Sequence, residues 1–185
     1  MDDIKKEAIL EKEKIISGMK TIILSTKCGK GKPNASYAPC VRDDDGFLYI
    51  YISRLSKHAT NLLSNANLST MIIEDESDAK NLFVRKRLTM NCVSNEIPRD
   101  TDNWLNKISL LENKFGESIS FLKKLTDFHL FQIEPIDGLL VYDFARAFRF
   151  EGRNLDKIKF LNDKGHTKKK ETGTKKWLKI LKVFW

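Results

Sequence analysis

Hydrophobic and polar positions along the chain follow two different periods, and these periods predict strands and helices in a mixed order. Runs of Ile, Leu, Val and aromatic residues with a period of two are typical of strands, because successive side chains point to opposite faces. The predicted strands are Thr21–Thr26, a stretch that begins at Ala35, Phe47–Ile52, Leu68–Glu74, Leu82–Val93, Phe128–Ile133 and Leu139–Phe150.

Apolar residues spaced three or four apart predict helices outside and between these strands. The predicted helices are Asp3–Ser17, one that begins within Ser53–Lys57, one from Thr101 or Asp102 toward Lys114, and a further piece within Phe115–Leu125. Trp104, Leu105, Ile108 and Leu111 recur at helical spacing in the third helix, so we expect them to face a core.

The order of these elements favours an antiparallel barrel. Asp43–Gly46 places a glycine where a hairpin needs a positive φ, so the strands on either side are expected to pair around a solvated turn. Strands joined by hairpins are typical of small barrels, whereas doubly wound sheets alternate strand and helix. We predict an α+β fold with a six- to seven-stranded antiparallel barrel, formed by residues 1–165 with a helix at 1–18.

Length and charge narrow the class of protein. A chain of 185 residues with 41% hydrophobic content can form one substantial core but not two comfortable domains. The net charge is +8, and the segment from His166 to Trp185 supplies +6 of it, with seven lysines against Glu171. The remaining body is close to neutral, which argues against a nucleic-acid-binding domain, because phosphate contacts need cations across the folded face.

Residues 166–185 are predicted to form a basic tail in two parts. The lysines, threonines and glycine after Gly165 resist packing. Trp177–Trp185 surrounds Lys179 and Lys182 with apolar residues, and a helix would group both lysines on one side. Such a segment fits a weak contact with a membrane surface, a contact with a partner subunit, or packing against the protein itself, and the pattern leaves these open.

Cysteine usage and the amino-terminal composition predict a reduced, cytoplasmic protein. Cys28, Cys40 and Cys92 are far apart and match no metal-ligand spacing. Met1–Lys14 carries too many lysines and glutamates for a secretion leader, and no apolar run approaches the length of a membrane span. No Cys-His or Ser-His-Asp arrangement is legible, so covalent nucleophilic catalysis has no support from the sequence.

Ser56, Lys57 and His58 lie where a predicted strand gives way to a helix. A helix N-terminus that carries hydroxyls and cations is a ready anion site. His58 is therefore either an anion contact or a surface residue. His129 alternates with apolar neighbours in a predicted strand, and we interpret it as a strand histidine satisfied by one partner.

Three stretches, found in this order, carry a family resemblance. They read ASYAPCVRDDDGFLYIYISRLSKHATNL from Ala35, RLTMNC from Arg87 and DFHLFQIEP from Asp127. Together they resemble the split-barrel relatives of pyridoxamine 5′-phosphate oxidase, and within that superfamily the HugZ-type haem-degrading branch. The resemblance covers roughly Met19 to His166. It implies a homodimer with each ligand site in the crevice between two barrels.

The resemblance also implies roles for individual residues. His166 matches the axial ligand of haem iron, and Asp127 matches the aspartate of the other subunit that hydrogen-bonds to this histidine. Such a carboxylate fixes the imidazole tautomer and raises the donor strength of the nitrogen that faces iron. Haem propionates need cations. The candidates for that role are Arg87, Arg146, Lys168 and Lys169.

We therefore predict a haem-binding, haem-degrading oxygenase of haem iron utilisation, with haem as ligand and substrate and a reductant that the sequence does not identify. One alternative is an FMN-dependent oxidoreductase of the same fold. It would hold the FMN phosphate through Ser56, Lys57, His58 and Arg87, although lysine and histidine supply less fixed bidentate charge than the arginine and lysine of flavin members. The other alternative is a haem carrier without catalysis.

Overall fold

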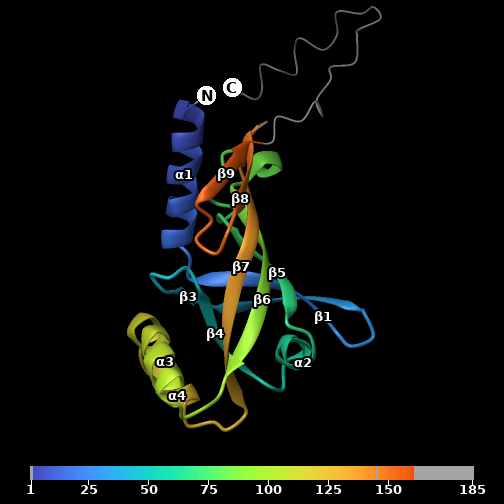
Figure 1. The fold of residues 1–185 in the computed structure, drawn as a ribbon, viewed down its shortest axis with the longest axis vertical. Coiled ribbons are helices and arrows are strands. Elements are labelled where there is room, and N and C mark those ends of the chain that lie inside the picture. Colours follow the sequence, from blue (N-terminus) through green and yellow to red (C-terminus); the bar gives the residue numbers. More distant parts are fainter. Residues whose placement is uncertain (1, 145, 161–185) are drawn as a thin grey trace, which may run out of the picture.

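The computed structural model describes residues 2–144 and 146–160, in which one antiparallel sheet curls into a split barrel flanked by helices (Figure 1). The helices are α1 (Asp2–Ser17), α2 (Lys57–Ser64), α3 (Asp102–Phe115) and α4 (Glu117–Leu122), with one 3₁₀ turn, η1 (Leu82–Val84). The strands are β1 (Thr21–Lys27), β2 (Pro33–Pro39), β3 (Val41–Arg42), β4 (Leu48–Ser53), β5 (Asn67–Ile73), β6 (Arg87–Ile97), β7 (Phe128–Asp143), β8 (Arg146–Glu151) and β9 (Lys157–Phe160). His166 and the predicted tail at 166–185 lie outside the described residues.

Strand β7 organises the sheet because it pairs with three other strands. Its first part, Phe128–Ile133, pairs with β4, its last part pairs with β8, and β6 accompanies it along almost its whole length. The strand order is β2-β1-β5-β6-β7-β4-β3; outside this order, β8 pairs with β7 and β9 pairs with β8. Because β7 runs along the long axis of the molecule (Figure 1), it defines two ends, which we call the Phe128 end and the Asp143 end.

The uninterrupted apolar run of β4 is explained by burial on both faces. Its even-numbered residues face the barrel core, whereas Tyr49 and Tyr51 pack with the apolar residues of α3 and α4. A strand buried on both sides needs no polar positions, so its sequence does not alternate. Helix α1 reaches the barrel core through Ala8 and Ile16, while Trp104 of α3 lies in the second cluster, as its helical spacing predicts. Leu105 was expected on the same buried face but is 52% exposed, because it follows Trp104 directly and so points to a different side of the helix.

The antiparallel α+β fold and all predicted helices are confirmed, but the described strands number nine, not six or seven. Leu82 was expected to open a strand and instead lies in η1, because the Asn81 side chain accepts a hydrogen bond from the Phe83 amide and stops the extended run. The predicted break after Ile133 is absent from β7. A bulge opposite Cys92 accommodates Pro135, which has no amide hydrogen to donate.

Two further differences concern turns. The predicted strand Leu139–Phe150 is divided, since β7 ends at Asp143 and the chain returns as β8 from Arg146. The acidic hairpin was expected to be solvated, yet the side chain of Asp43 is only 8% exposed. Burial opposes ionisation of Asp43, but hydrogen bonds from Lys107, Tyr49 and the Phe47 amide outweigh it and lower the pKa of the carboxyl group. This network ties the hairpin to α3.

We expect Gly46→Ala to lower the free energy of unfolding by about 2 kcal/mol or more. Gly46 has φ +90°, and a Cβ atom there would lie 2.2 Å from Asn154 Oδ1. Gly31→Ala is the matched control, because Gly31 has φ +79° but open space around it, so only the backbone cost of about 1 kcal/mol applies. Urea unfolding measures both variants, and equal losses would show that the contact with Asn154 has no effect.

Candidate functional site

Asp127 and the strand-to-helix junction form one polar group at the Phe128 end. Strand β4 ends at Ser53 directly opposite Phe128, so Asp127 lies beside the junction. The Ser53 hydroxyl donates to Asp127 Oδ2 at 2.5 Å, and the Arg54 amide donates to the Asp127 carbonyl oxygen at 2.7 Å. The structure therefore brings Asp127 to the predicted anion site, a proximity that the sequence did not predict.

Within this junction the fold itself uses the Ser56 hydroxyl. Ser56 is the N-cap of α2: its Oγ accepts from the Ala59 amide at 3.4 Å and donates to the Ser53 carbonyl at 2.7 Å. Lys57 is exposed, and its ammonium group has no hydrogen-bond or ion-pair partner within residues 2–144 and 146–160. Of the two, Lys57 is the group available to an anionic ligand, supported by the partial positive charge of the helix N-terminus.

His58 is a half-buried residue in the first turn of α2. Burial removes water from the imidazole and lowers its pKa below the ordinary value of 6.5. His58 is consequently neutral at pH 7 and offers a phosphate a hydrogen bond but no charge. This weakens the interpretation of the junction as an FMN phosphate site, which needs fixed cations.

Arg87 lies far from the junction. It opens β6 opposite Val141 of β7, and its Nη1 donates to the Arg85 carbonyl at 2.9 Å. Strand residues rise about 3.3 Å each, so the stretch of β7 from Phe128 to Val141 covers on the order of 40 Å. Within one chain Arg87 therefore does not share a site with Ser56, Lys57 and His58.

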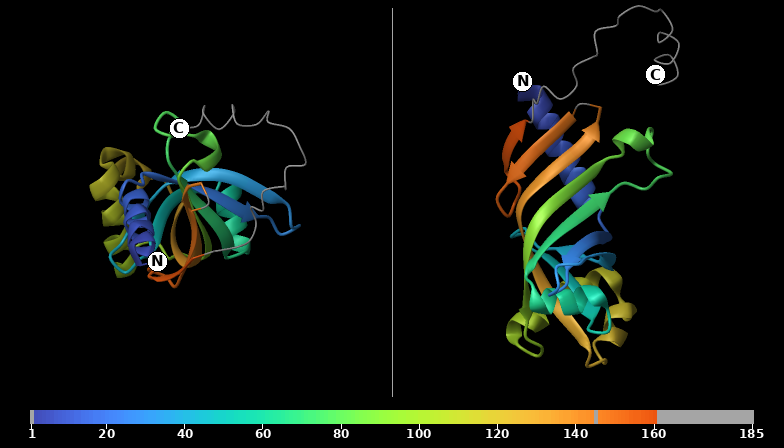
Figure 2. Two further views of the ribbon diagram at one scale, coloured as in Figure 1. Left: turned by 90° about the horizontal axis from the view of Figure 1, so that it is seen from above. Right: turned by 90° about the vertical axis from the view of Figure 1, so that its right-hand side faces the viewer.

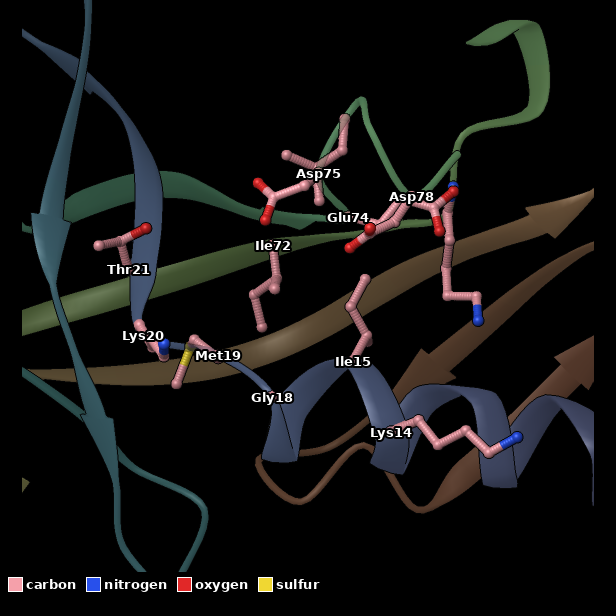
Figure 3. A pocket seen from close by; sticks show the side chains of 12 residues that line it. Lys14, Ile15, Gly18, Met19, Lys20, Thr21, Ile72, Glu74, Asp75 and Asp78 are labelled. Carbon is pink, nitrogen blue, oxygen red and sulfur yellow. The ribbon is translucent and has the colours of Figure 1, made fainter. Parts of the chain in front are cut away.

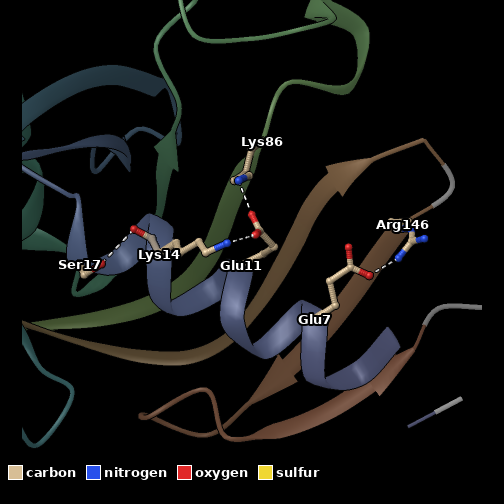
Figure 4. Close-up of polar contacts among 6 residues, drawn as sticks. All are labelled: Glu7, Glu11, Lys14, Ser17, Lys86 and Arg146. Atoms are coloured by element: carbon tan, nitrogen blue, oxygen red, sulfur yellow. Dashed lines mark hydrogen bonds and ion pairs between the residues drawn. The ribbon is translucent and has the colours of Figure 1, made fainter. Parts of the chain in front are cut away.

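Arg146 lies at the Asp143 end, as Arg87 does. It opens β8, forms an ion pair with Glu7 of α1 (Figure 4), and lies 5.9 Å from the centre of the Tyr142 ring. One helical turn further along, Glu11 contacts both Lys14 and Lys86, and these two cations lower the pKa of its carboxyl group. The pairs fasten α1 across the strands of this end and hold the Arg146 guanidinium near the surface.

A cavity of about 560 Å³ lies between the end of α1 and the loop after β5 (Figure 3). Its lining is Lys14, Ile15, Gly18, Met19, Lys20, Thr21, Ile72, Ile73, Glu74, Asp75, Asp78 and Lys86. None of the predicted site residues that the structure describes contributes to it. Ligand pockets for flat organic cofactors are mostly apolar, whereas this lining mixes lysines with carboxylates, so we place the candidate site at the two strand ends.

Two apolar residues are exposed although the sequence did not predict it. Leu55 is 90% exposed within the junction, and Phe83 is 87% exposed in η1. Contiguous exposed apolar patches mark surfaces that meet a ligand or a partner, whereas single exposed residues are ordinary, so neither residue alone defines a contact surface. The sequence held one signal, because Leu55 interrupts an otherwise polar junction, whereas Phe83 was hidden in a predicted strand.

His129 and the two buried cysteines have structural roles in the fold. His129 Nδ1 lies 2.5 Å from Glu96 Oε1, so this strand histidine has the single partner that was predicted. Burial raises the pKa of the Cys40 and Cys92 thiols to about 12, which removes thiolate chemistry at neutral pH.

In the described ranges no three His, Cys, Asp or Glu side chains are grouped to bind a metal, and no helix has the length and apolarity to cross a membrane. The predicted iron ligand, His166, lies outside those ranges.

Comparison with known proteins identifies relatives of this arrangement. A family model described as pyridoxamine 5′-phosphate oxidase matches residues 11–142. A protein of Vibrio cholerae serotype O1 (strain ATCC 39315 / El Tor Inaba N16961), named heme oxygenase HutZ, is 42% identical over 150 residues, which are 80% of this chain and 84% of the relative.

Two solved structures share the fold and part of the sequence. The crystal structure of HutZ, there called the heme storage protein from Vibrio cholerae, has a TM-score of 0.68 at 39% identity and covers 78% of this chain and 96% of its own. Campylobacter jejuni ChuZ has a TM-score of 0.77 at 27% identity, over 91% of this chain and 66% of its own. The comparisons confirm the resemblance to the split-barrel relatives of pyridoxamine 5′-phosphate oxidase.

The lowered pKa of His58 makes stability depend on pH in a defined direction. Well above pH 6.5 the imidazole is neutral in both states; as the pH falls through that value, the unfolded chain takes up the proton first, and stability declines until the pH has fallen below the folded pKa. We expect His58→Gln to reduce this decline. Urea unfolding across this range, with an NMR titration of the His58 ring, measures the effect, and a His58 that titrates at or above 6.5 would contradict it.

Proposed function

We propose that this chain, which belongs to the pyridoxamine 5′-phosphate oxidase family, binds haem and degrades it oxidatively as a homodimer. Support for haem comes from the relative named as a heme oxygenase, and from the fact that the same protein is also called a heme storage protein. Both names refer to haem, but only the first implies that the protein degrades it. Haem binding is therefore supported by both names, and haem degradation by one of them.

The observation that carries the homodimer is the distance between Asp127 and the point where the described chain ends. Phe160 of β9 pairs with Phe148, which pairs with Leu140, so the chain leaves near the Asp143 end. Six further residues lead to His166, and they span at most about 20 Å even when fully extended. Asp127 lies at the Phe128 end, on the order of 40 Å away along β7. A contact between Asp127 and His166 therefore requires two copies.

A two-fold axis across the long direction of the molecule supplies that contact. It reverses one copy relative to the other and places the Phe128 end of one beside the Asp143 end of its partner. Asp127 and Lys57 of one copy then face Arg87, Arg146 and the chain that leads to His166 of the other. Residues that one chain holds at opposite ends are thereby collected in two equivalent crevices.

The residues present at the Phe128 end fit the role of orienting a haem ligand. Asp127 is half-buried, and the hydrogen bond from Ser53 occupies Oδ2 while Oδ1 has no partner among the residues that the structure describes. Oδ1 can therefore accept the N–H of an imidazole, which would fix the tautomer of His166 and strengthen its other nitrogen as an iron ligand. Bound haem supplies the redox chemistry with dioxygen. Arg87 and Arg146 would hold its propionates.

A second candidate, FMN-dependent oxidoreduction, is favoured by the ammonium of Lys57 at the N-terminus of α2, which has no partner among the described residues. Against it, the Ser56 hydroxyl is used as a cap, and the low pKa of His58 removes its charge at pH 7. FMN retained through desalting, with a yellow protein, would support this candidate over haem.

We expect His166→Ala and Asp127→Asn each to weaken haem binding by about tenfold or more, because each removes one half of the ligand pair. The sharper result comes from mixing the two variants and allowing subunits to exchange. Each mixed dimer then has one crevice in which both residues are intact, so about a quarter of all sites should recover the wild-type Soret spectrum. A mixture with no recovery would place both residues in one chain or remove them from the site.

Turnover separates the enzyme from a haem carrier. Haem-loaded protein with ascorbate and dioxygen is expected to lose its Soret band and yield a biliverdin-like product. A stable Soret band under these conditions, with unchanged haem affinity, would instead identify a carrier.

A further inference from the structure

Ser53 contacts Asp127 directly, although the sequence did not select it as a site residue. It ends β4 at the Phe128 end, where α2, α3 and α4 lie around the start of β7 (right-hand view of Figure 2). The Ser53 hydroxyl lies 2.5 Å from Asp127 Oδ2, and its oxygen accepts from the Leu55 amide at 3.1 Å. Because an amide N–H only donates and a carboxylate only accepts, the single hydroxyl proton of Ser53 is directed to Asp127.

The backbone around this hydrogen bond is also fixed. The Ser53 carbonyl accepts from the Ser56 amide at 3.1 Å and from the Ser56 hydroxyl at 2.7 Å, which joins Ser53 to the N-cap of α2. The Arg54 amide donates to the Asp127 carbonyl oxygen at 2.7 Å. Asp127 is therefore bonded to the junction through both its main chain and its side chain.

Arg99 fixes the chain that leads into Asp127. Its Nη1 donates to the Leu125 carbonyl at 2.8 Å, and its Nη2 donates to the Lys123 carbonyl. Both carbonyl groups belong to the connection between α4 and β7. Since the backbone is held on both sides, the remaining freedom of Asp127 is rotation of its side chain, and the hydrogen bond from Ser53 opposes that rotation.

We propose that Ser53 is a positioning residue of the haem site, which holds the Asp127 carboxylate so that Oδ1 accepts the N–H of His166 of the partner subunit. The inference rests on the proposed function and adds a residue that acts through Asp127. A carboxylate held in one orientation forms a better-aligned hydrogen bond with an imidazole. This bond gives the ring more anionic character and strengthens its bond to iron, so loss of the Ser53 hydroxyl should weaken both bonds.

Two properties of the haem complex of the full chain test this role. They are the haem dissociation constant and the iron–histidine stretching frequency of the ferrous complex, measured by resonance Raman spectroscopy. We expect Ser53→Ala to raise the dissociation constant by about threefold or more and to lower the stretching frequency. Ser53→Thr keeps the hydroxyl and should retain the wild-type values, whereas Ser53→Cys, whose S–H is a weak donor, should fall between.

Thr60→Ala is the matched control, because it removes a hydroxyl from the same helix start. The Thr60 hydroxyl donates to the carbonyls of Lys57 at 3.0 Å and Ser56 at 3.5 Å. Both haem properties should stay at their wild-type values in this variant, and urea unfolding curves check that every variant folds. Equal changes in Thr60→Ala and Ser53→Ala would show that haem binding responds to α2 as a whole, which would overturn the specific role of Ser53.

A double-mutant cycle with Asp127→Asn decides whether Ser53 acts through Asp127. If it does, Ser53→Ala should have no further effect on either haem property once Asp127→Asn is present. Equal losses with and without Asp127→Asn, or no loss in Ser53→Ala alone, would overturn the inference, and the proposed function would stand as long as Asp127→Asn itself weakens haem binding. If Asp127→Asn leaves haem binding unchanged, the proposed pairing of Asp127 with His166 fails, and the role of Ser53 fails with it.

Discussion

The three-way pairing of β7 is the constraint on which the rest of the structure depends. One strand pairs with β4 at its beginning, with β8 at its end and with β6 along most of its length. Because β7 runs in one direction along its whole length, the groups at its two ends are separated by much more than the length of a side chain. Asp127 and Arg87 are kept apart for this reason.

Some polar groups are hydrogen-bonded within the fold, whereas others have no partner in the described ranges. The second kind indicates which residues can contact a ligand. Ser56 caps α2, Asp43 fastens the hairpin to α3, and Lys12 is 3% exposed with its ammonium bonded to the Leu155 carbonyl. Each of these groups is satisfied internally. Lys57 and Oδ1 of Asp127 have no such partner within the described ranges, which makes them available to a ligand or to a second subunit.

Symmetry is the simplest way to join what one chain separates. A two-fold axis brings unlike ends together twice, so an incomplete site at each end becomes two complete sites.

The sequence by itself determined the helices, the hairpin glycine and the antiparallel class, because periodicity and turn chemistry are local. It also carried the family resemblance, and with it Asp127 and the Ser56–His58 junction as site candidates. Strand boundaries at Leu82 and Pro135 were wrong, since a side-chain cap and a bulge were decided by pairing across the sheet. Only the tertiary structure placed Asp127 beside Ser53 and far from Arg87, because distances between residues remote in sequence are set by strand register and not by local pattern.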